Sequence, residues 1–288
     1  MKAEIYKPIQ NRKEHLAVKH PELQKVFATE QPMIGMVHLL PLPGYLGHPG
    51  MDVLMQDAFE KVHTLKAAGY DGVLVENDGD KIPYAGKNIE RRDVVRGILK
   101  QIVEEANLLS MPVGLEILYD DLGTFQVANE AGAKFVRFDV YVDNVVTARG
   151  SEIHGNAEKI QELKHYLGSN LLIFADVHVK HAKVTDGKTL EQSAKQAAAM
   201  GADVISVTGE WTGLQPDLND LQVVRLSIPE NVSVAVGSGA NAENVQTLLA
   251  NGANVVLVGS SIKTNGKIDS EKAQAFIEAV KGKNDISR

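Results

Sequence analysis

The sequence predicts an α/β protein: a single-domain (β/α)8 TIM barrel that follows a short N-terminal extension. Eight short segments rich in Val, Ile, Leu and Phe alternate along the chain with longer amphipathic segments. The apolar segments are nearly continuous, which is typical of parallel strands covered on both faces. The chain has 288 residues, and eight strand–helix units within about 250 residues favour a closed barrel over a doubly wound sheet.

The expected strands begin at Met33. Residues 1–31 are polar and rich in Lys, Glu and His, which predicts an arm or short helix packed under the barrel. We expect residues 32–284 to form the barrel, because no linker or low-complexity segment divides them. The eight expected strands are Met33–Leu39, Gly72–Glu76, Val113–Leu118, Phe135–Asp139, Leu171–Val177, Asp203–Val207, Val232–Val236 and Val255–Val258.

The amphipathic segments between these strands are expected to be helices. A glycine recurs shortly before several strands, at Gly69, Gly132, Gly201 and Gly252. A glycine in that place ends a helix in the left-handed conformation and turns the chain toward the next strand. The recurrence therefore indicates a repeated structural unit and no binding motif. The expected helices include Asp52–Ala68, Asn88–Leu109, Ala157–Leu167, Thr189–Met200, Ala242–Ala250 and Ser270–Val280.

Composition excludes several classes of function. A net charge of −7 and a pI near 5.7 disfavour a nucleic-acid-binding protein, which normally carries a basic stripe. The absence of cysteine excludes disulfides, thiolate metal sites and cysteine nucleophiles. The first residues lack the apolar core of a signal peptide, and no apolar run approaches the about 20 residues that span a bilayer. We expect a cytoplasmic protein with no transmembrane segment, and association into a homo-oligomer stays open.

Two glycine-rich turns follow the last two expected strands and predict a phosphate site. In (β/α)8 barrels the loops after these strands commonly bind phosphate. Backbone N–H groups and hydroxyls stabilise a dianion without a large desolvation cost. Lys263 is placed to assist. The residues expected to bind the phosphate of a small substrate are Gly237, Ser238, Gly239, Ala240, Gly259, Ser260 and Ser261.

Polar residues concentrate where the other expected strands end. Asp176, His178 and Lys180 fall at alternate positions, so an extended chain would point all three to one side. Together with Glu76 and His38, they predict a catalytic acid/base set with mutually shifted pKa values. For His38 alone, a hydrogen-bonded core position is an equal alternative.

Additional charged residues leave other chemistry open. Carboxylates outnumber imidazoles, which suits Mg²⁺ or Mn²⁺ if a metal binds. Lys180 could also form a Schiff base. The residue types favour acid/base chemistry first, metal binding second and imine formation third. The residues expected to bind substrate or a cation are Glu116, Arg137, Asp139 and Glu210. The candidate metal ligands are Glu76, Glu116, Asp139, Asp176 and His178.

Several of these strand-end motifs resemble the BtpA/SgcQ family. They include Met36-Val37-His38-Leu39, Val75-Glu76-Asn77, Phe174 to His181, and Val236-Gly237-Ser238-Gly239. The resemblance covers nearly the whole chain and implies a barrel similar to ribulose-phosphate-binding barrels. It also implies a non-catalytic alternative, because one branch is named for a factor needed for stable photosystem I. Glu116 and Asp139 stand where the family often has Asn, which makes this end of the barrel more acidic.

The motifs together predict an enzyme that acts on a small phosphorylated metabolite, either a sugar phosphate or a phosphoribosyl compound. Isomerisation or aldol-type cleavage fits the residues best, because both need an acid and a base near a carbonyl group. Hydrolysis of a glycosidic or phosphate bond stays open. The alternative is a biogenesis or assembly factor of the BtpA type, which would use the outer surface of the barrel.

Overall fold

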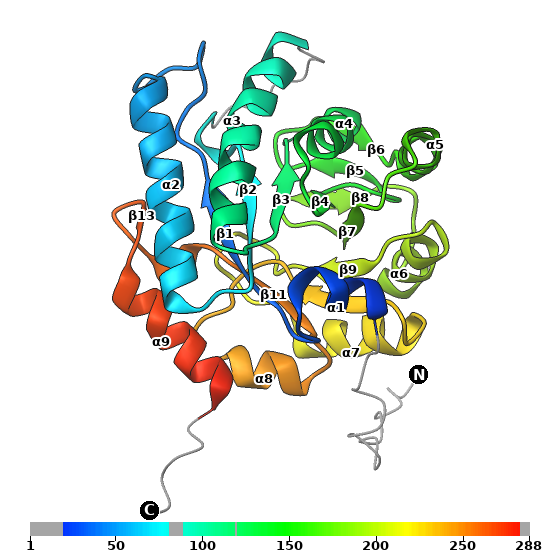
Figure 1. Cartoon of the computed structure of the whole chain (residues 1–288). Helices are drawn as coiled ribbons and strands as arrows, with labels where there is room; N and C mark the ends of the chain where they lie inside the picture. Colours follow the sequence, from blue (N-terminus) through cyan, green and yellow to red (C-terminus); the bar gives the residue numbers. More distant parts are fainter. Residues whose placement is uncertain (1–19, 81–88, 119, 283–288) are drawn as a thin grey trace, which may run out of the picture.

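The protein forms a closed barrel of eight parallel strands surrounded by helices (Figure 1). A computed structural model describes residues 20–80, 89–118 and 120–282. The strands follow one another around the barrel in chain order, and β11 pairs with β1 to close it. The predicted (β/α)8 fold is therefore confirmed. The barrel strands are β1 (Met33–His38), β2 (Gly72–Glu76), β3 (Val113–Glu116), β4 (Phe135–Phe138), β7 (Leu172–Val177), β9 (Val204–Val207), β10 (Ser233–Val236) and β11 (Val255–Val258).

Helices cover the outside of the barrel and one short helix precedes it. No helix within the described ranges is long and apolar enough to cross a membrane. No range was given in advance for two helices, α4 and α7, although Gly132 predicted the end of a helix where α4 ends. The helices are α1 (Pro21–Phe27), α2 (Met51–Ala68), α3 (Ile89–Leu108), α4 (Asp121–Ala131), α5 (Ala157–Leu167), α6 (Leu190–Ala199), α7 (Leu218–Ser227), α8 (Val245–Ala250) and α9 (Ser270–Lys281), with single 3-10 turns at η1 (Asp78–Asp80) and η2 (Ser260–Ile262).

The recurring glycines end helices as expected. Gly69 and Gly132 are the C-caps of α2 and α4, with φ angles of 95° and 82°. Gly201 and Gly252 follow the C-caps of α6 and α8 by one residue, with φ angles of 78° and 109°. Residues with a Cβ rarely adopt these angles. Each glycine therefore turns the chain into the next barrel strand.

The N-terminal end of the barrel is filled by aromatic side chains. Phe27 of α1 packs against Phe135, with ring centroids 5.4 Å apart, and Phe135 packs against Phe174 at 4.9 Å. Gly114 makes room for them, because a Cβ there would lie 2.2 Å from the Phe135 ring. The short helix in the N-terminal segment thus closes the floor of the barrel, while residues 1–19 of the expected arm lie outside the described residues.

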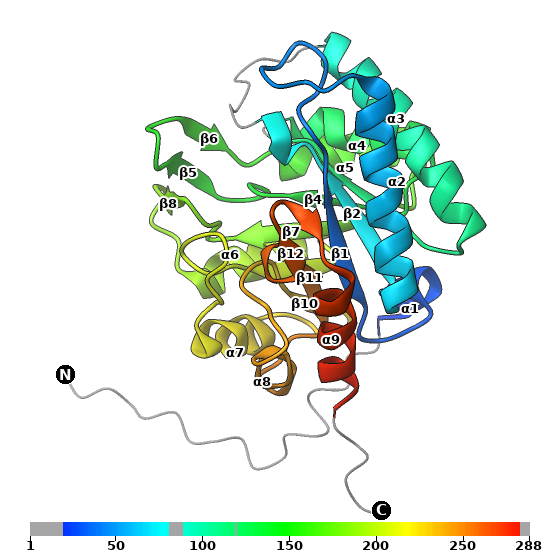
Figure 2. The same ribbon diagram turned by 90° about the vertical axis from the view of Figure 1, so that its left-hand side faces the viewer.

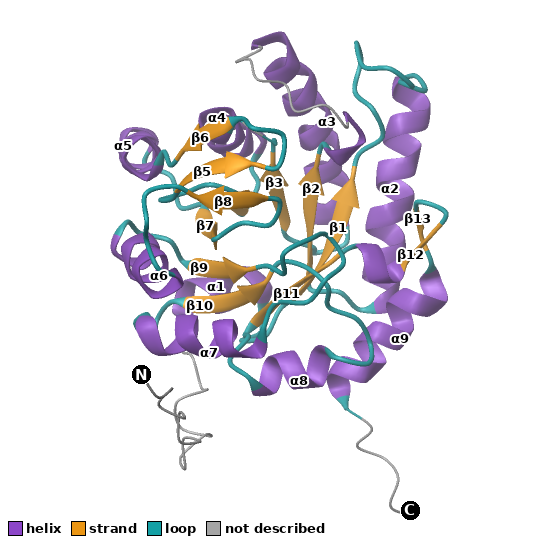
Figure 3. Cartoon of the chain, turned by 180° about the vertical axis from the view of Figure 1, so that it is seen from behind, coloured by secondary structure: helices purple, strands orange, loops and turns teal. Residues whose placement is uncertain are grey.

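A small three-stranded antiparallel sheet stands beyond the ends of β4 and β7 (Figures 2 and 3). Its strands are β5 (Asn144–Thr147), β6 (Glu152–His154) and β8 (Ala182–Val184), and none of them was predicted. Val140, Val145 and Val179 form its own apolar core. A hairpin of β12 (Lys263–Thr264) and β13 (Lys267–Ile268) follows η2 after the last barrel strand. Both additions belong to loops at the C-terminal end of the barrel, where the polar residues also lie.

Candidate active site

Arg137 lies at the centre of the polar end of the barrel. Its Nε and Nη2 donate to the two carboxylate oxygens of Asp176 at 3.0 and 2.7 Å, and its Nη1 donates to Glu116 Oε2 at 3.0 Å. Asp139 Oδ1 lies 3.7 Å from Nη2. The side chain is only 2% exposed. Burial alone would lower the pKa of Arg137, but Asp176 and Glu116 raise it above its usual value. A permanent positive charge therefore sits among three carboxylates contributed by β3, the end of β4 and β7.

The surroundings of Glu116 favour its protonated form. Its Oε1 is buried and has no hydrogen-bond partner among the described residues. Burial raises the pKa of Glu116 well above the usual range, and the charges of Asp139 and Glu76 oppose the lowering effect of Arg137. Burial also acts on Asp139, but Arg137 and Lys180 hold the pKa of Asp139 below its usual value. The protonated Glu116 can then donate a hydrogen bond to the ionised Asp139.

Glu76 and His38 form a second pair beside this centre. They are opposite each other in the register of β1 and β2, and His38 Nε2 lies 3.6 Å from Glu76 Oε2. Burial raises the pKa of Glu76 to about 7, because it outweighs the attraction of Lys180 and Arg137. The charges of Asp139 and Asp78 raise it further. A carboxyl group with such a pKa can both accept and return a proton near neutral pH.

His38 is neutral because cations and burial disfavour its charged form. Lys263 Nζ lies 2.5 Å from His38 Nδ1, and Lys61 Nζ donates to the His38 carbonyl at 2.8 Å. Burial, then Lys263 and Lys61, lower the pKa of His38 to about 3. Since Lys263 donates to Nδ1, the ring proton sits on Nε2, the nitrogen that faces Glu76.

The predicted alternation after the fifth barrel strand is wrong. β7 ends at Val177, and His178 adopts a left-handed φ of 49°, so the chain is no longer extended there. The His178 N–H donates to Asp143, and its ring acts electrostatically on Asp220 of α7. Lys180 does act on His38, Glu76 and Asp139.

Asp176 is engaged by Arg137 in this structure. Both of its oxygens are occupied by Arg137, and none of its side-chain surface is exposed. A carboxylate held in this way orients the guanidinium. The acid/base candidates at this end are therefore Glu76, His38 and Lys180, with Asp176 as a positioning residue.

The turn after β10 is tightly packed against the loop after β9. The Gly237 N–H donates to Val207, and Ser238 Oγ accepts from Gly209 N at 2.7 Å and donates to the Leu214 carbonyl at 2.8 Å. In this structure the Ser238 hydroxyl therefore links the two loops. Gly239 has a φ of 70°. Within the described residues, the N–H groups of Ser238, Gly239 and buried Ala240 have no acceptor.

The turn after β11 lies beside His38. A Cβ built on Gly259 would be 3.6 Å from His38 Cε1. The N–H groups of Ser260 and Ser261 have no acceptor in the described part of the chain, and Ser261 Oγ is buried without a partner. Both glycine-rich turns therefore open at the same end of the barrel as Glu76 and His38.

The described residues do not fit the metal alternative. Among them, no group of three or more His, Asp or Glu side chains is arranged to hold a metal ion. Arg137 occupies the position between Glu116, Asp139 and Asp176 that a cation would need. Glu210, expected to bind substrate or a cation, is exposed on the loop after β9, where its carbonyl accepts from His181 N.

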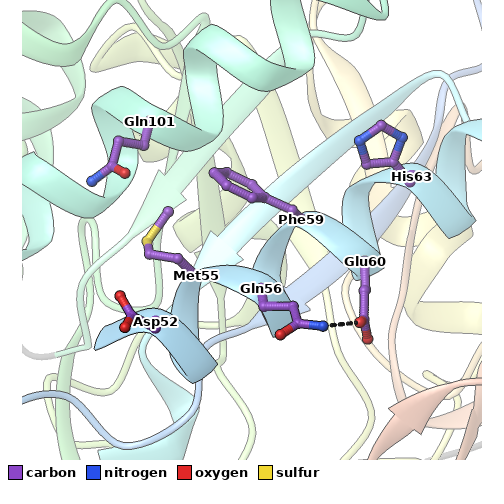
Figure 4. A pocket seen from close by; sticks show the side chains of 7 residues that line it. All are labelled: Asp52, Met55, Gln56, Phe59, Glu60, His63 and Gln101. Atoms are coloured by element: carbon purple, nitrogen blue, oxygen red, sulfur yellow. Dashed lines mark hydrogen bonds between the residues drawn. The ribbon is translucent and has the colours of Figure 1, made fainter. Parts of the chain in front are cut away.

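An open groove lies elsewhere, on the outer face of α2 and α3 (Figure 4). Its volume is about 660 Å³, and its lining includes Met55, Phe59 and His63 of α2 and Gln101 of α3. Gln56 and Glu60 hydrogen-bond to each other along its edge at 3.0 Å. The groove does not include the strand-end residues. The candidate active site is therefore placed at the polar groups of the strand ends and not at this groove.

Sequence reasoning missed Lys61 and Asp78. Lys61 is buried in α2 and pairs with Asp57 four residues earlier, a spacing that could have indicated an ion pair. Asp78 Oδ2 lies 3.7 Å from His38 Nδ1, but nothing in its sequence context separates it from a helix-capping aspartate. Both residues affect the charge around His38.

Comparison with solved structures supports the barrel. The structure of N-(5'-phosphoribosyl)anthranilate isomerase from Pyrococcus furiosus aligns with 87% of this chain and 98% of that chain, with a TM-score of 0.53 and 17% identity. Thiamine phosphate pyrophosphorylase from the same organism aligns with 88% of this chain and 96% of that chain, with a TM-score of 0.57 and 16% identity. At such identities the likeness shows the fold alone.

Curated relatives extend over nearly the full chain. Photosystem I biogenesis protein BtpA of Synechocystis is 34% identical over 266 residues, which cover 90% of this chain and 91% of that protein. The putative sgc region protein SgcQ of Escherichia coli is 25% identical and covers 90% of this chain and 97% of that protein. The BtpA family model matches residues 29–282. The likeness thus extends beyond a shared fold to the sequence itself, and the chain belongs to the BtpA family.

Proposed function

We propose that this protein is an enzyme that isomerises or cleaves a small phosphorylated sugar by acid/base catalysis. Glu76 removes and returns a proton next to the substrate carbonyl, and His38 hydrogen-bonds to the substrate oxygen through Nε2–H. Lys180 stabilises the negative charge that develops on that oxygen. The backbone N–H groups after β10 and β11 bind the phosphate.

The observation that carries this proposal is the Glu76–His38 pair. A carboxyl group with a pKa raised to about 7 faces a histidine whose pKa is lowered to about 3. Environments that shift the pKa values of two neighbouring groups in opposite directions are a feature of acid/base sites. The turn after β11 begins at Gly259 beside the same histidine, and its Ser260 and Ser261 N–H groups and Ser261 hydroxyl have no partner among the described residues. The names of the similar barrels, which refer to phosphorylated compounds, agree with this substrate class.

Deuterium uptake from D₂O tests the proposal without knowledge of the final product. Isomerisation and aldol cleavage both pass through an enediol or enolate, whose carbon takes up deuterium from the solvent. We expect one member of a panel of triose, pentose and hexose phosphates to take up deuterium, and NMR detects this uptake. Because Glu76 acts as base when ionised, the rate should fall about tenfold per pH unit below its pKa of about 7.

The matched variants are Glu76→Gln and Glu158→Gln. We expect Glu76→Gln to reduce uptake by about 10²-fold or more, the contribution typical of a general base. Glu158 is an exposed carboxylate on α5, so Glu158→Gln should retain the wild-type rate. Uptake that survives Glu76→Gln unchanged would contradict the assignment of the base, and no uptake across the panel would contradict the proposed reaction.

The alternative is a biogenesis or assembly role without catalysis. It rests on the name of the Synechocystis relative. In a host that depends on this protein, such a role should survive Glu76→Gln at normal protein levels. The enzymatic role should be lost with the same substitution, so complementation by this variant separates the two functions.

A further inference from the structure

Lys263 connects the phosphate-binding turn to the histidine of the acid/base pair. It directly follows η2, the turn that begins after Gly259, and its ammonium reaches back to His38 Nδ1 at 2.5 Å. Burial and the charge of Lys61 lower the pKa of Lys263 itself. Its contact with His38 therefore joins residues 225 positions apart in sequence, and one end of that contact belongs to the loop that would meet the phosphate.

We propose that phosphate binding draws the Lys263 ammonium away from His38 Nδ1 and so converts His38 into a group that can take up and donate a proton. This inference rests on the proposed phosphate site. A dianion beside Ser260 and Ser261 offers the ammonium a stronger partner than a neutral imidazole nitrogen. Nδ1 is then free to bind a proton, and that proton comes from the solvent or from the substrate hydroxyl. Lys263 acts as a positioning residue, and the substrate's own phosphate switches on the acid.

The charges around His38 favour this response. With Lys263 in contact, burial and the surrounding positive charges keep the ring neutral. Once Lys263 is paired with phosphate, the two carboxylates within 4 Å of the ring, at 3.6 and 3.7 Å, favour the imidazolium. The charged groups that face His38 are Lys61 of α2, Glu76 and Asp78 at the end of β2, Arg137 of β4, Lys180 after β7 and Lys263 of β12.

NMR titration of ¹³C-labelled histidine, with and without inorganic phosphate, tests the coupling in the wild-type protein. Because the lowered pKa keeps His38 neutral, its signal should not move between pH 8 and pH 5 in free protein. Saturating phosphate should raise the midpoint of His38 by about two units or more, into this pH range, a hundredfold or greater rise in the protonated fraction. A parallel melting curve shows whether phosphate binds.

The matched variants are Lys263→Met and Lys267→Met, which lie on the same β12–β13 hairpin. Lys263→Met should raise the His38 midpoint even without phosphate and remove most of the phosphate effect, whereas Lys267→Met, at an exposed position, should behave as wild type. A phosphate-induced rise in melting temperature with an unmoved His38 midpoint would overturn this inference and leave the proposed function standing. No rise in melting temperature would overturn both.

Discussion

At the scale of single residues, Arg137 determines how the acidic end of the barrel is held together. It offers one buried guanidinium to Asp176, Glu116 and Asp139. A buried ion pair is weak evidence of net stability, but removing one partner leaves uncompensated charge in a low-dielectric interior. The positions of the Glu116 and Asp176 side chains therefore depend on Arg137, because its guanidinium is buried and hydrogen-bonds to both.

Arg137→Met should destabilise the protein by about 3–5 kcal/mol at neutral pH, because the buried carboxylates lose their counter-charge. The loss should shrink as the pH falls toward 4, since carboxylates whose pKa values are no longer lowered by Arg137 take up protons. Urea unfolding at two pH values measures this, with exposed Arg149→Met as the control. Equal stability of the two variants at pH 7 would contradict the assigned role.

Residue positions at the strand ends were largely predictable, and their partners were not. The sequence predicted Glu76, Glu116, Arg137 and Asp139 at one end because each lies in or at the end of the second half of an apolar run. The sequence could not show that His178 departs from the extended alternation expected for Asp176, His178 and Lys180. The left-handed backbone after Val177 depends on the Asp143 contact from a distant loop.

At the scale of elements, the turn after β10 is fixed by packing as well as by backbone conformation. Gly239 and Gly213 both have positive φ angles, 70° and 85°. A Cβ on Gly239 would lie 2.1 Å from Gln215 N, whereas a Cβ on Gly213 would meet nothing within 4 Å. The two glycines therefore separate the cost of the left-handed conformation from the cost of the close approach.

We expect Gly213→Ala to cost about 1 kcal/mol, the usual penalty for a residue with a Cβ in this region. Gly239→Ala should cost clearly more, because the backbone of Gln215 and Leu214 must also move. Thermal unfolding of both variants measures the difference. If they lose the same stability, the turn after β10 is not held against the loop after β9.

The missed elements have physical reasons. α4 contains Gly123 and Thr124, which lower helix propensity. Both are required by contacts, since a Cβ on Gly123 would meet Asp120 at 2.2 Å and Thr124 Oγ1 accepts from Ile117 N at 2.9 Å. β5, β6 and β8 are short and pair across two separate loops, so no local pattern predicts them.

At the scale of the whole molecule, the closed barrel brings the two ends of the chain together at one site. β1 pairs with β2 on one side and with β11 on the other, so His38 lies between Glu76 and the loop that carries Lys263. The eight apolar segments sufficed to predict this closure. Membership of the BtpA family agrees with it over residues 29–282.

The most direct test of the account is a crystal structure of this protein with bound inorganic phosphate. We predict that the phosphate lies against the backbone N–H groups of Ser238–Ala240 and Ser260–Ser261, at the same end of the barrel as Glu76 and His38. Phosphate found only elsewhere, such as on the outer face of α2 and α3, or no phosphate at saturating concentration, would contradict the central claim.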